Sequence, residues 1–210
     1  MMEAKTTTMS QTQVVSKARR RIGLLGGTFN PPHFGHLMIG DQVANELNLD
    51  QVLFMPNAQP PHVDAKTAVD PMMRAMMVKA AIMGNSKFGL EMSEIERGGK
   101  SYSYDTVVAL EAAHPENDYY FIIGGDEVAY LKTWYRIDDL VERVHFVGVN
   151  RPEQPVRSDY PVEWVQVPNV AISSSDIRQR IKEHRSIRYL VPDMVAAYIF
   201  KEGLYLDTAE

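Results

Sequence analysis

The chain has 210 residues, a length that suits one domain with a small subdomain. It contains no cysteine, which excludes a disulfide scaffold, a thiol enzyme and a thiolate zinc site. Lys and Arg number 22 against 27 Asp and Glu, and this net charge of −5 argues against a partner that is a nucleic-acid polymer.

The first 20 residues differ from the rest of the chain. They are rich in Thr, Gln and Ser, and they hold four basic residues and one acidic residue, so residues 21–210 carry a net charge of −8. We expect 1–20 to be a disordered tail or an expression remnant, with the basic run 17–21 a solvated lead-in rather than a targeting patch. No stretch reads as an export signal or a membrane span, so we expect a cytoplasmic protein with no membrane partner.

Beyond residue 21, short apolar runs alternate with helical patterns. The expected strands are Ile22–Leu25, Val52–Met55, Phe88–Met92, Tyr119–Ile123, Val144–Val149 and Trp164–Val167. The expected helices between them are His36–Asn48, Met72–Met83, Tyr104–Ala113 and Val128–Val144, the last broken near Trp134–Arg136. The alternation predicts an α/β fold with a mostly parallel sheet flanked by helices.

Two further features complete the expected domain of residues 21–210. The helix Met72–Met83 is apolar almost all round, so we expect its methionines to pack in the core. After Ile172 two helices follow, Ser174–His184 and Pro192–Glu202, with Gly203 as the stop signal. We therefore expect residues 172–210 to form a small C-terminal helical subdomain.

The turn after the first strand is the richest in chemistry. Gly26 and Gly27 let the backbone approach a ligand, and a helix beginning near Gly35 points its positive end to the same place. His33 and His36 add two imidazoles there. The spacing matches neither the dinucleotide fingerprint nor the Walker A loop.

Three interpretations of these histidines remain open on the residues alone. They could be turn or cap residues, two ligands of a metal ion, or donors to a phosphate. The metal site lacks a cysteine or a third ligand nearby in sequence. Paired glycines and a helix start within twelve residues favour phosphate recognition.

The segment Gly26–Leu37 (GGTFNPPHFGHL) resembles the opening motif of the HxGH nucleotidyltransferases, and Ile172–Arg178 (ISSSDIR) resembles their second motif. Within that superfamily, the segments IGGD at 123–126, WY at 134–135 and SYSYDT at 101–106 are similar to bacterial nicotinate mononucleotide adenylyltransferases. Departures are Asn30 where Asp is common, Val63 where Lys is frequent (Lys66 lies nearby), and Ser175 in place of Thr.

The resemblance implies a Rossmann-like nucleotidyltransferase fold and a reaction between ATP and nicotinate mononucleotide, with Mg²⁺ bound mainly through the ATP phosphates. The mononucleotide phosphate would attack the α-phosphorus of ATP directly, so no protein nucleophile is needed. The protein itself would supply no metal cage. The sequence does not determine whether the protein is a monomer or a homo-oligomer.

The resemblance also assigns roles to individual residues. His36 would contact the α-phosphate, His33 the triphosphate and Arg178 the leaving pyrophosphate. The remaining ATP-binding residues would be Gly26, Gly27, Thr28, Phe29, Gly35, Ile172, Ser173 and Ser174. The mononucleotide-binding residues would be Ser103, Asp126, Trp134, Tyr135 and Arg151.

Each of these roles has a plainer structural alternative. Ser173 and Asp126 could simply cap helices, Arg178 could form a surface salt bridge, and Trp134 could be a core residue. For the whole chain, the rival functions are a sister adenylyltransferase acting on nicotinamide mononucleotide or phosphopantetheine, and a nucleotide-binding regulatory module without catalysis.

Overall fold

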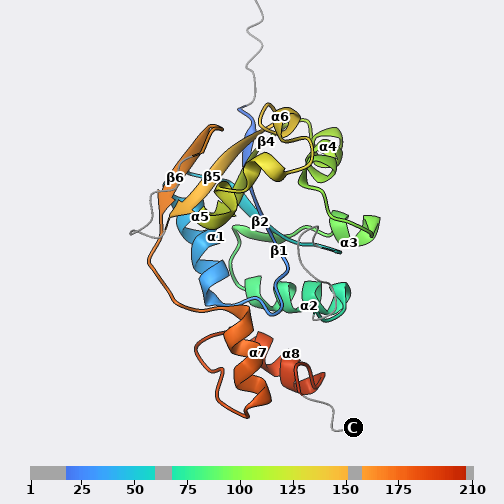
Figure 1. Cartoon of the computed structure of the whole chain (residues 1–210), viewed down its shortest axis with the longest axis vertical. Coiled ribbons are helices and arrows are strands. Elements are labelled where there is room, and N and C mark those ends of the chain that lie inside the picture. The colour runs from blue at the N-terminus through green and yellow to red at the C-terminus, as the bar shows by residue number, and fades with distance from the viewer. Residues whose placement is uncertain (1–17, 60–67, 151–157, 207–210) are drawn as a thin grey trace, which may run out of the picture.

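A computed structural model describes residues 18–59, 68–150 and 158–206 (Figure 1). Its six-stranded sheet has the order β3-β2-β1-β4-β5-β6, and every neighbouring pair is parallel. The strands are β1 (Arg20–Gly27), β2 (Gln51–Pro56), β3 (Phe88–Leu90), β4 (Asn117–Gly124), β5 (Val144–Asn150) and β6 (Val162–Gln166). The predicted α/β class and parallel sheet are confirmed.

Helices cover both faces of this sheet. They are α1 (Phe34–Glu46), α2 (Pro71–Ile82), α3 (Ser93–Arg97), α4 (Ser103–Ala113), α5 (Gly125–Val128), the 3₁₀ turn η2 (Leu131–Thr133), α6 (Ile137–Leu140), α7 (Ser174–Lys182) and α8 (Asp193–Lys201). On one face α4 and α6 pack Val107 and Leu140 against the strands. On the other, α1 and α2 contribute Val43 and Val78 to a second core. None of the described helices is long and apolar enough to cross a bilayer.

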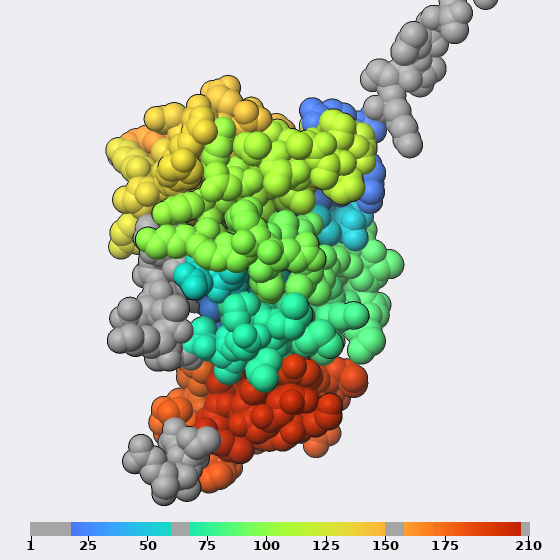
Figure 2. All heavy atoms as spheres, turned by 90° about the vertical axis from the view of Figure 1, so that its right-hand side faces the viewer, coloured from blue at the N-terminus to red at the C-terminus, as the bar shows by residue number. Residues whose placement is uncertain are grey.

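The last two helices, α7 and α8, pack together below the sheet and against α2 (Figure 1). Ile177 of α7 and Val195 and Ile199 of α8 are fully buried with Met77 of α2. Figure 2 shows α2 (teal) lying between α3 and α4 (green) and α8 (red). The segment after β6 thus returns to the edge of the sheet where β1 ends.

The prediction that the methionines of 72–83 pack in the core is wrong for three of them. Met72, Met76 and Met83 are 50%, 43% and 64% exposed, whereas Met77 is fully buried. Within the described parts of the chain, α2 packs against the sheet and α8, and Met72 and Met76, four residues apart, share the side that faces away from both. The same helix buries Arg74, which the sequence reading passed over.

Several helix boundaries also differ from the prediction. Helix α1 begins at Phe34, before the expected His36, because His33 has extended backbone and serves as its N-cap. The expected helix 128–144 is a series of short turns, and Val144 already belongs to β5. The predicted break is present: Arg136 has a left-handed φ of 53° between η2 and α6. Helix α3 was not predicted.

Candidate active site

The turn after β1 is shaped by a buried aromatic ring. Phe29 is 2% exposed and its ring packs edge-on against His36 at a centroid distance of 5.0 Å. A Cβ on Gly27 would lie 3.1 Å from that ring, so glycine is the residue that fits there. A cis Asn30–Pro31 peptide then leads the chain to His33 and α1.

His33 and His36 form a close pair at the start of α1, with ring centroids 3.8 Å apart and ring planes tilted by 33°. The backbone N–H of His33 donates to Nδ1 of His36 over 3.2 Å, so the proton of the neutral His36 ring lies on Nε2. Burial lowers the pKa of His33 to about 4, and burial followed by repulsion from His33 lowers that of His36 to about 3. Both rings are therefore neutral near pH 7.

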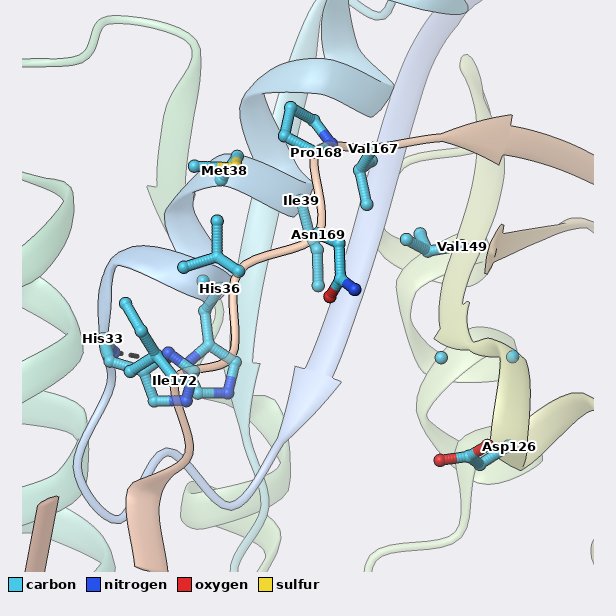
Figure 3. Close-up of a pocket in the computed structure, with 14 residues that line it drawn as sticks. His33, His36, Met38, Ile39, Asp126, Val149, Val167, Pro168, Asn169 and Ile172 are labelled. Atoms are coloured by element: carbon cyan, nitrogen blue, oxygen red, sulfur yellow. Dashed lines mark hydrogen bonds between the residues drawn. The ribbon is translucent and has the colours of Figure 1, made fainter. Parts of the chain in front are cut away.

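These histidines line a pocket of about 230 Å³ at the carboxyl edge of the sheet (Figure 3). Of the residues predicted to bind ligands, the pocket brings together His33, Gly35, His36, Asp126 and Ile172. Asp126 lies in the first turn of α5 and faces the pocket from the side opposite the two imidazoles. Its cap alternative does not apply, because Gly124 is the N-cap.

No ligand-binding role was predicted for the rest of the pocket lining, although Gly124 and Gly125 belong to the IGGD segment. The missed residues are Met38, Ile39, Gly124, Gly125, Val149, Val167, Pro168, Asn169 and Val170. Most of them lie in the last residues of β4 or β5 or directly after β4 or β6, at the edge where the parallel strands end. That position was the available signal, because ligands of open α/β sheets bind beyond the carboxyl ends of the strands.

The second motif binds the first through side chain to backbone hydrogen bonds. Ser174 Oγ donates to the carbonyl of Pro31 over 2.8 Å, and Arg178 Nη1 donates to the carbonyl of Asn30 over 2.8 Å. Ser173 caps α7 by accepting from the N–H of Asp176 at 3.1 Å. Within the described chain Arg178 contacts no carboxylate, so the salt-bridge alternative does not hold.

The residues expected to hold the nicotinate ring form a second group. Tyr135 is 49% exposed and its ring lies 4.8 Å from that of Tyr102, the residue before Ser103. Trp134 is half-buried and packs edge-on against Phe121 at 5.6 Å. This group does not line the histidine pocket.

The remaining predicted ligand residues have different places. Gly26 and Gly27 end β1 and Thr28 begins the turn after it; Gly26 is exposed and the other two are partly exposed. Arg151, Val63 and Lys66 lie outside the described residues. Among the described residues, no group of three or more His, Asp or Glu side chains comes together to hold a metal ion.

The cytidylyltransferase-like family matches residues 24–180, which run from β1 into α7. The fold and the site thus define a nucleotidyltransferase. A relative from Lactiplantibacillus plantarum, named "Probable nicotinate-nucleotide adenylyltransferase", is 55% identical over 202 residues, 96% of each chain. One from Enterococcus faecalis with the same name is 51% identical over 191 residues, 91% of this chain and 87% of that one. The chain belongs to this family of nicotinate-nucleotide adenylyltransferases.

Solved structures agree with this fold. A Plasmodium falciparum nicotinic acid mononucleotide adenylyltransferase, complexed with NaAD, superposes with a TM-score of 0.73 over 89% of this chain and 97% of that chain. The sequence identity is 20%, so this likeness concerns the fold alone.

Proposed function

We propose that the chain transfers the adenylyl group of ATP to nicotinate mononucleotide, releasing pyrophosphate and forming nicotinate adenine dinucleotide for NAD biosynthesis. The observation that carries this is the close pair of neutral imidazoles, His33 and His36, in a pocket at the carboxyl edge of the sheet. The names of the relatives supply the substrate.

His36 is the proposed donor to the reacting phosphorus centre. Its Nδ1 is occupied by the His33 amide, which leaves Nε2–H to bind an oxygen of the α-phosphate as charge develops there. The attacking phosphate monoester has a second pKa of about 6 and is already ionised near neutral pH, so the site needs no strong base. His33, the paired glycines and the start of α1 are proposed to hold the triphosphate.

Arg178 is the proposed contact for the leaving pyrophosphate. Its bonds to Asn30 O and Ser175 Oγ use two of five N–H groups, and three remain for phosphate oxygens. These placed donors matter because residues 21–210 carry a net charge of −8 and both substrates are anions. Asp126 is proposed to accept from a ribose hydroxyl.

The proposed mononucleotide site uses Trp134 to stack on the ring and the backbone N–H groups of Ser103 and Tyr135 to bind its carboxylate, with Arg151 near its phosphate. An acid accepts at both oxygens, whereas an amide turns an NH₂ donor toward one N–H. Each such mismatch costs about 1–3 kcal/mol, which disfavours nicotinamide mononucleotide.

Magnesium is proposed to arrive with ATP, its remaining ligands being waters and phosphate oxygens. The donor set of the pocket fits this, since backbone N–H groups and neutral imidazoles bind phosphate rather than the ion, and Asp126 is the carboxylate that lines the pocket. When bound, Mg²⁺ neutralises charge on the phosphates.

The test is dinucleotide and pyrophosphate formation from Mg-ATP and each of three acceptors: nicotinate mononucleotide, nicotinamide mononucleotide and phosphopantetheine. We expect the highest kcat/KM with nicotinate mononucleotide. A preference for either other acceptor, or ATP binding without turnover, would replace the proposal by one of its rivals. His36→Ala should lower kcat by about 10²-fold or more, the scale for losing a transition-state donor.

A further inference from the structure

Arg74 of α2 is a buried cation that the mechanism above does not use. It is 1% exposed and donates five hydrogen bonds. Four acceptors are backbone carbonyls: Thr28 at 2.8 Å, Asn57 at 2.7 Å, Ala58 at 3.1 Å and Val69 at 3.1 Å. The fifth is Oδ1 of Asn57 at 3.3 Å.

Those acceptors belong to three separate segments at the ligand-binding edge of the sheet. Thr28 is in the turn after β1, Asn57 and Ala58 follow β2, and Val69 precedes α2. Two further bonds join the first two segments: Asn57 N–H donates to Gly27 O at 3.1 Å, and its Nδ2 donates to Thr28 Oγ1 at 3.4 Å. One guanidinium therefore fixes the turn of β1 to the loop of β2.

Arginine suits this buried position because of the number and arrangement of its N–H donors. Only arginine presents five N–H groups in a planar fork, so a lysine could satisfy three of these acceptors at most. None of the hydrogen-bond acceptors is a carboxylate. Asp70 acts on Arg74 through its charge, but burying a cation whose hydrogen-bond acceptors are all neutral is still costly for folding. Its position beneath a turn for anionic substrates points to a use beyond stability.

We infer that Arg74 is a positioning residue for adenylyl transfer: by holding the carbonyl of Thr28 against the loop after β2, it sets where the turn that follows β1, from Thr28 to His33, lies against the phosphates. This inference rests on the proposed function. A displacement of about 1 Å in such a site can lower turnover by about 10²-fold, even from a residue remote from the reacting atoms.

The test compares Arg74→Lys with Leu49→Ala. Leu49 is 1% exposed and precedes β2 at the opposite edge of the sheet, so its truncation destabilises the same core without touching the turn. At temperatures chosen to give the same folded fraction, we expect Arg74→Lys to lower kcat by about tenfold or more and Leu49→Ala by less than about twofold. Equal losses in the two variants would reduce Arg74 to a structural residue and overturn the inference.

A milder variant covers the case in which Arg74→Lys does not fold. Asn57→Ala removes one acceptor of Arg74 and the bond to Thr28 Oγ1, and it leaves the backbone carbonyls in place. We expect kcat to fall with little change in Tm; unchanged kcat would contradict the inference.

Binding of a non-hydrolysable ATP analogue, measured by calorimetry, separates this inference from the proposed function. If the wild type binds the analogue but makes no dinucleotide, the proposed function fails. Weaker analogue binding by Arg74→Lys or Asn57→Ala than by Leu49→Ala would still support the role of Arg74, and equal binding would refute it.

Discussion

The backbone N–H of His33 donates to Nδ1 of His36 across 3.2 Å, and this bond fixes which nitrogen of His36 faces the pocket as a donor. Because the two ring centroids also lie only 3.8 Å apart and burial removes both rings from water, a positive charge on either one is disfavoured. The pair therefore acts in the proposed reaction as neutral donors rather than as an imidazolium.

The first prediction concerns the protonation of this pair. In a ¹⁵N NMR titration between pH 5 and 8, we expect the imidazole nitrogens of His33 and His36 to show no transition, since their pKa values are lowered to about 4 and about 3. His36→Gln and His33→Gln identify the signals. A transition of either ring near pH 6.5 would contradict the neutral assignment.

The second prediction is the pH dependence of stability. Because both folded-state pKa values lie below the unfolded value of about 6.5, the unfolded chain binds more protons in acid. The free energy of unfolding should thus fall as pH drops from about 6.5 toward 4. Urea titrations of the wild type and of a His33→Gln/His36→Gln variant measure this, and the variant should lose part of the slope. An identical slope in the two proteins would argue against the pair as its source.

The third prediction separates Arg178 from its neighbour Arg180. Arg178→Lys keeps the charge but loses the fork that bonds Asn30 O and Ser175 Oγ, so kcat should fall by about 10-fold or more. Arg180→Ala removes an ion pair with Asp176 on the same helix and should leave kcat within about twofold. If both variants kept normal turnover in a pyrophosphate assay, Arg178 would have no catalytic role.

The fourth prediction concerns the two tryptophans. Trp134→Ala should raise the KM for nicotinate mononucleotide by about tenfold while changing that for ATP little, because stacking is lost on one substrate only. The control is Trp164→Ala: that ring is half-buried against the same core but belongs to β6. A larger effect of Trp134→Ala on the KM for ATP would contradict the stacking role.

The alternation of strands and helices, which implies a parallel sheet, and the histidine turn were predictable because both patterns are local in sequence. Strand and helix periodicities differ, and Gly26–Leu37 carries its whole pattern in twelve residues. Long-range pairings were not predictable in this way. Tyr205 Oη donates to Asn30 Oδ1 at 2.7 Å across 175 residues, and this bond gives the Asn that departs from the family pattern a defined partner.

The wrong prediction for the methionines of α2 and the unpredicted burial of Arg74 have the same cause. Composition alone made the helix look buried, but which methionines are covered depends on where α8 docks. The burial of Arg74 was not predicted, because its acceptors come from segments up to 46 residues away. Periodicity alone cannot tell which side chains are buried when the elements that cover them lie elsewhere in the chain.

The most direct test of the central claim, that the site joins two anions without a protein nucleophile, is the stereochemical course at the α-phosphorus. A single diastereomer of ATP carrying sulfur on that phosphorus would be reacted with nicotinate mononucleotide, and the configuration of the dinucleotide determined. Direct displacement predicts inversion. Net retention would show that a protein side chain takes the adenylyl group first and would contradict the account.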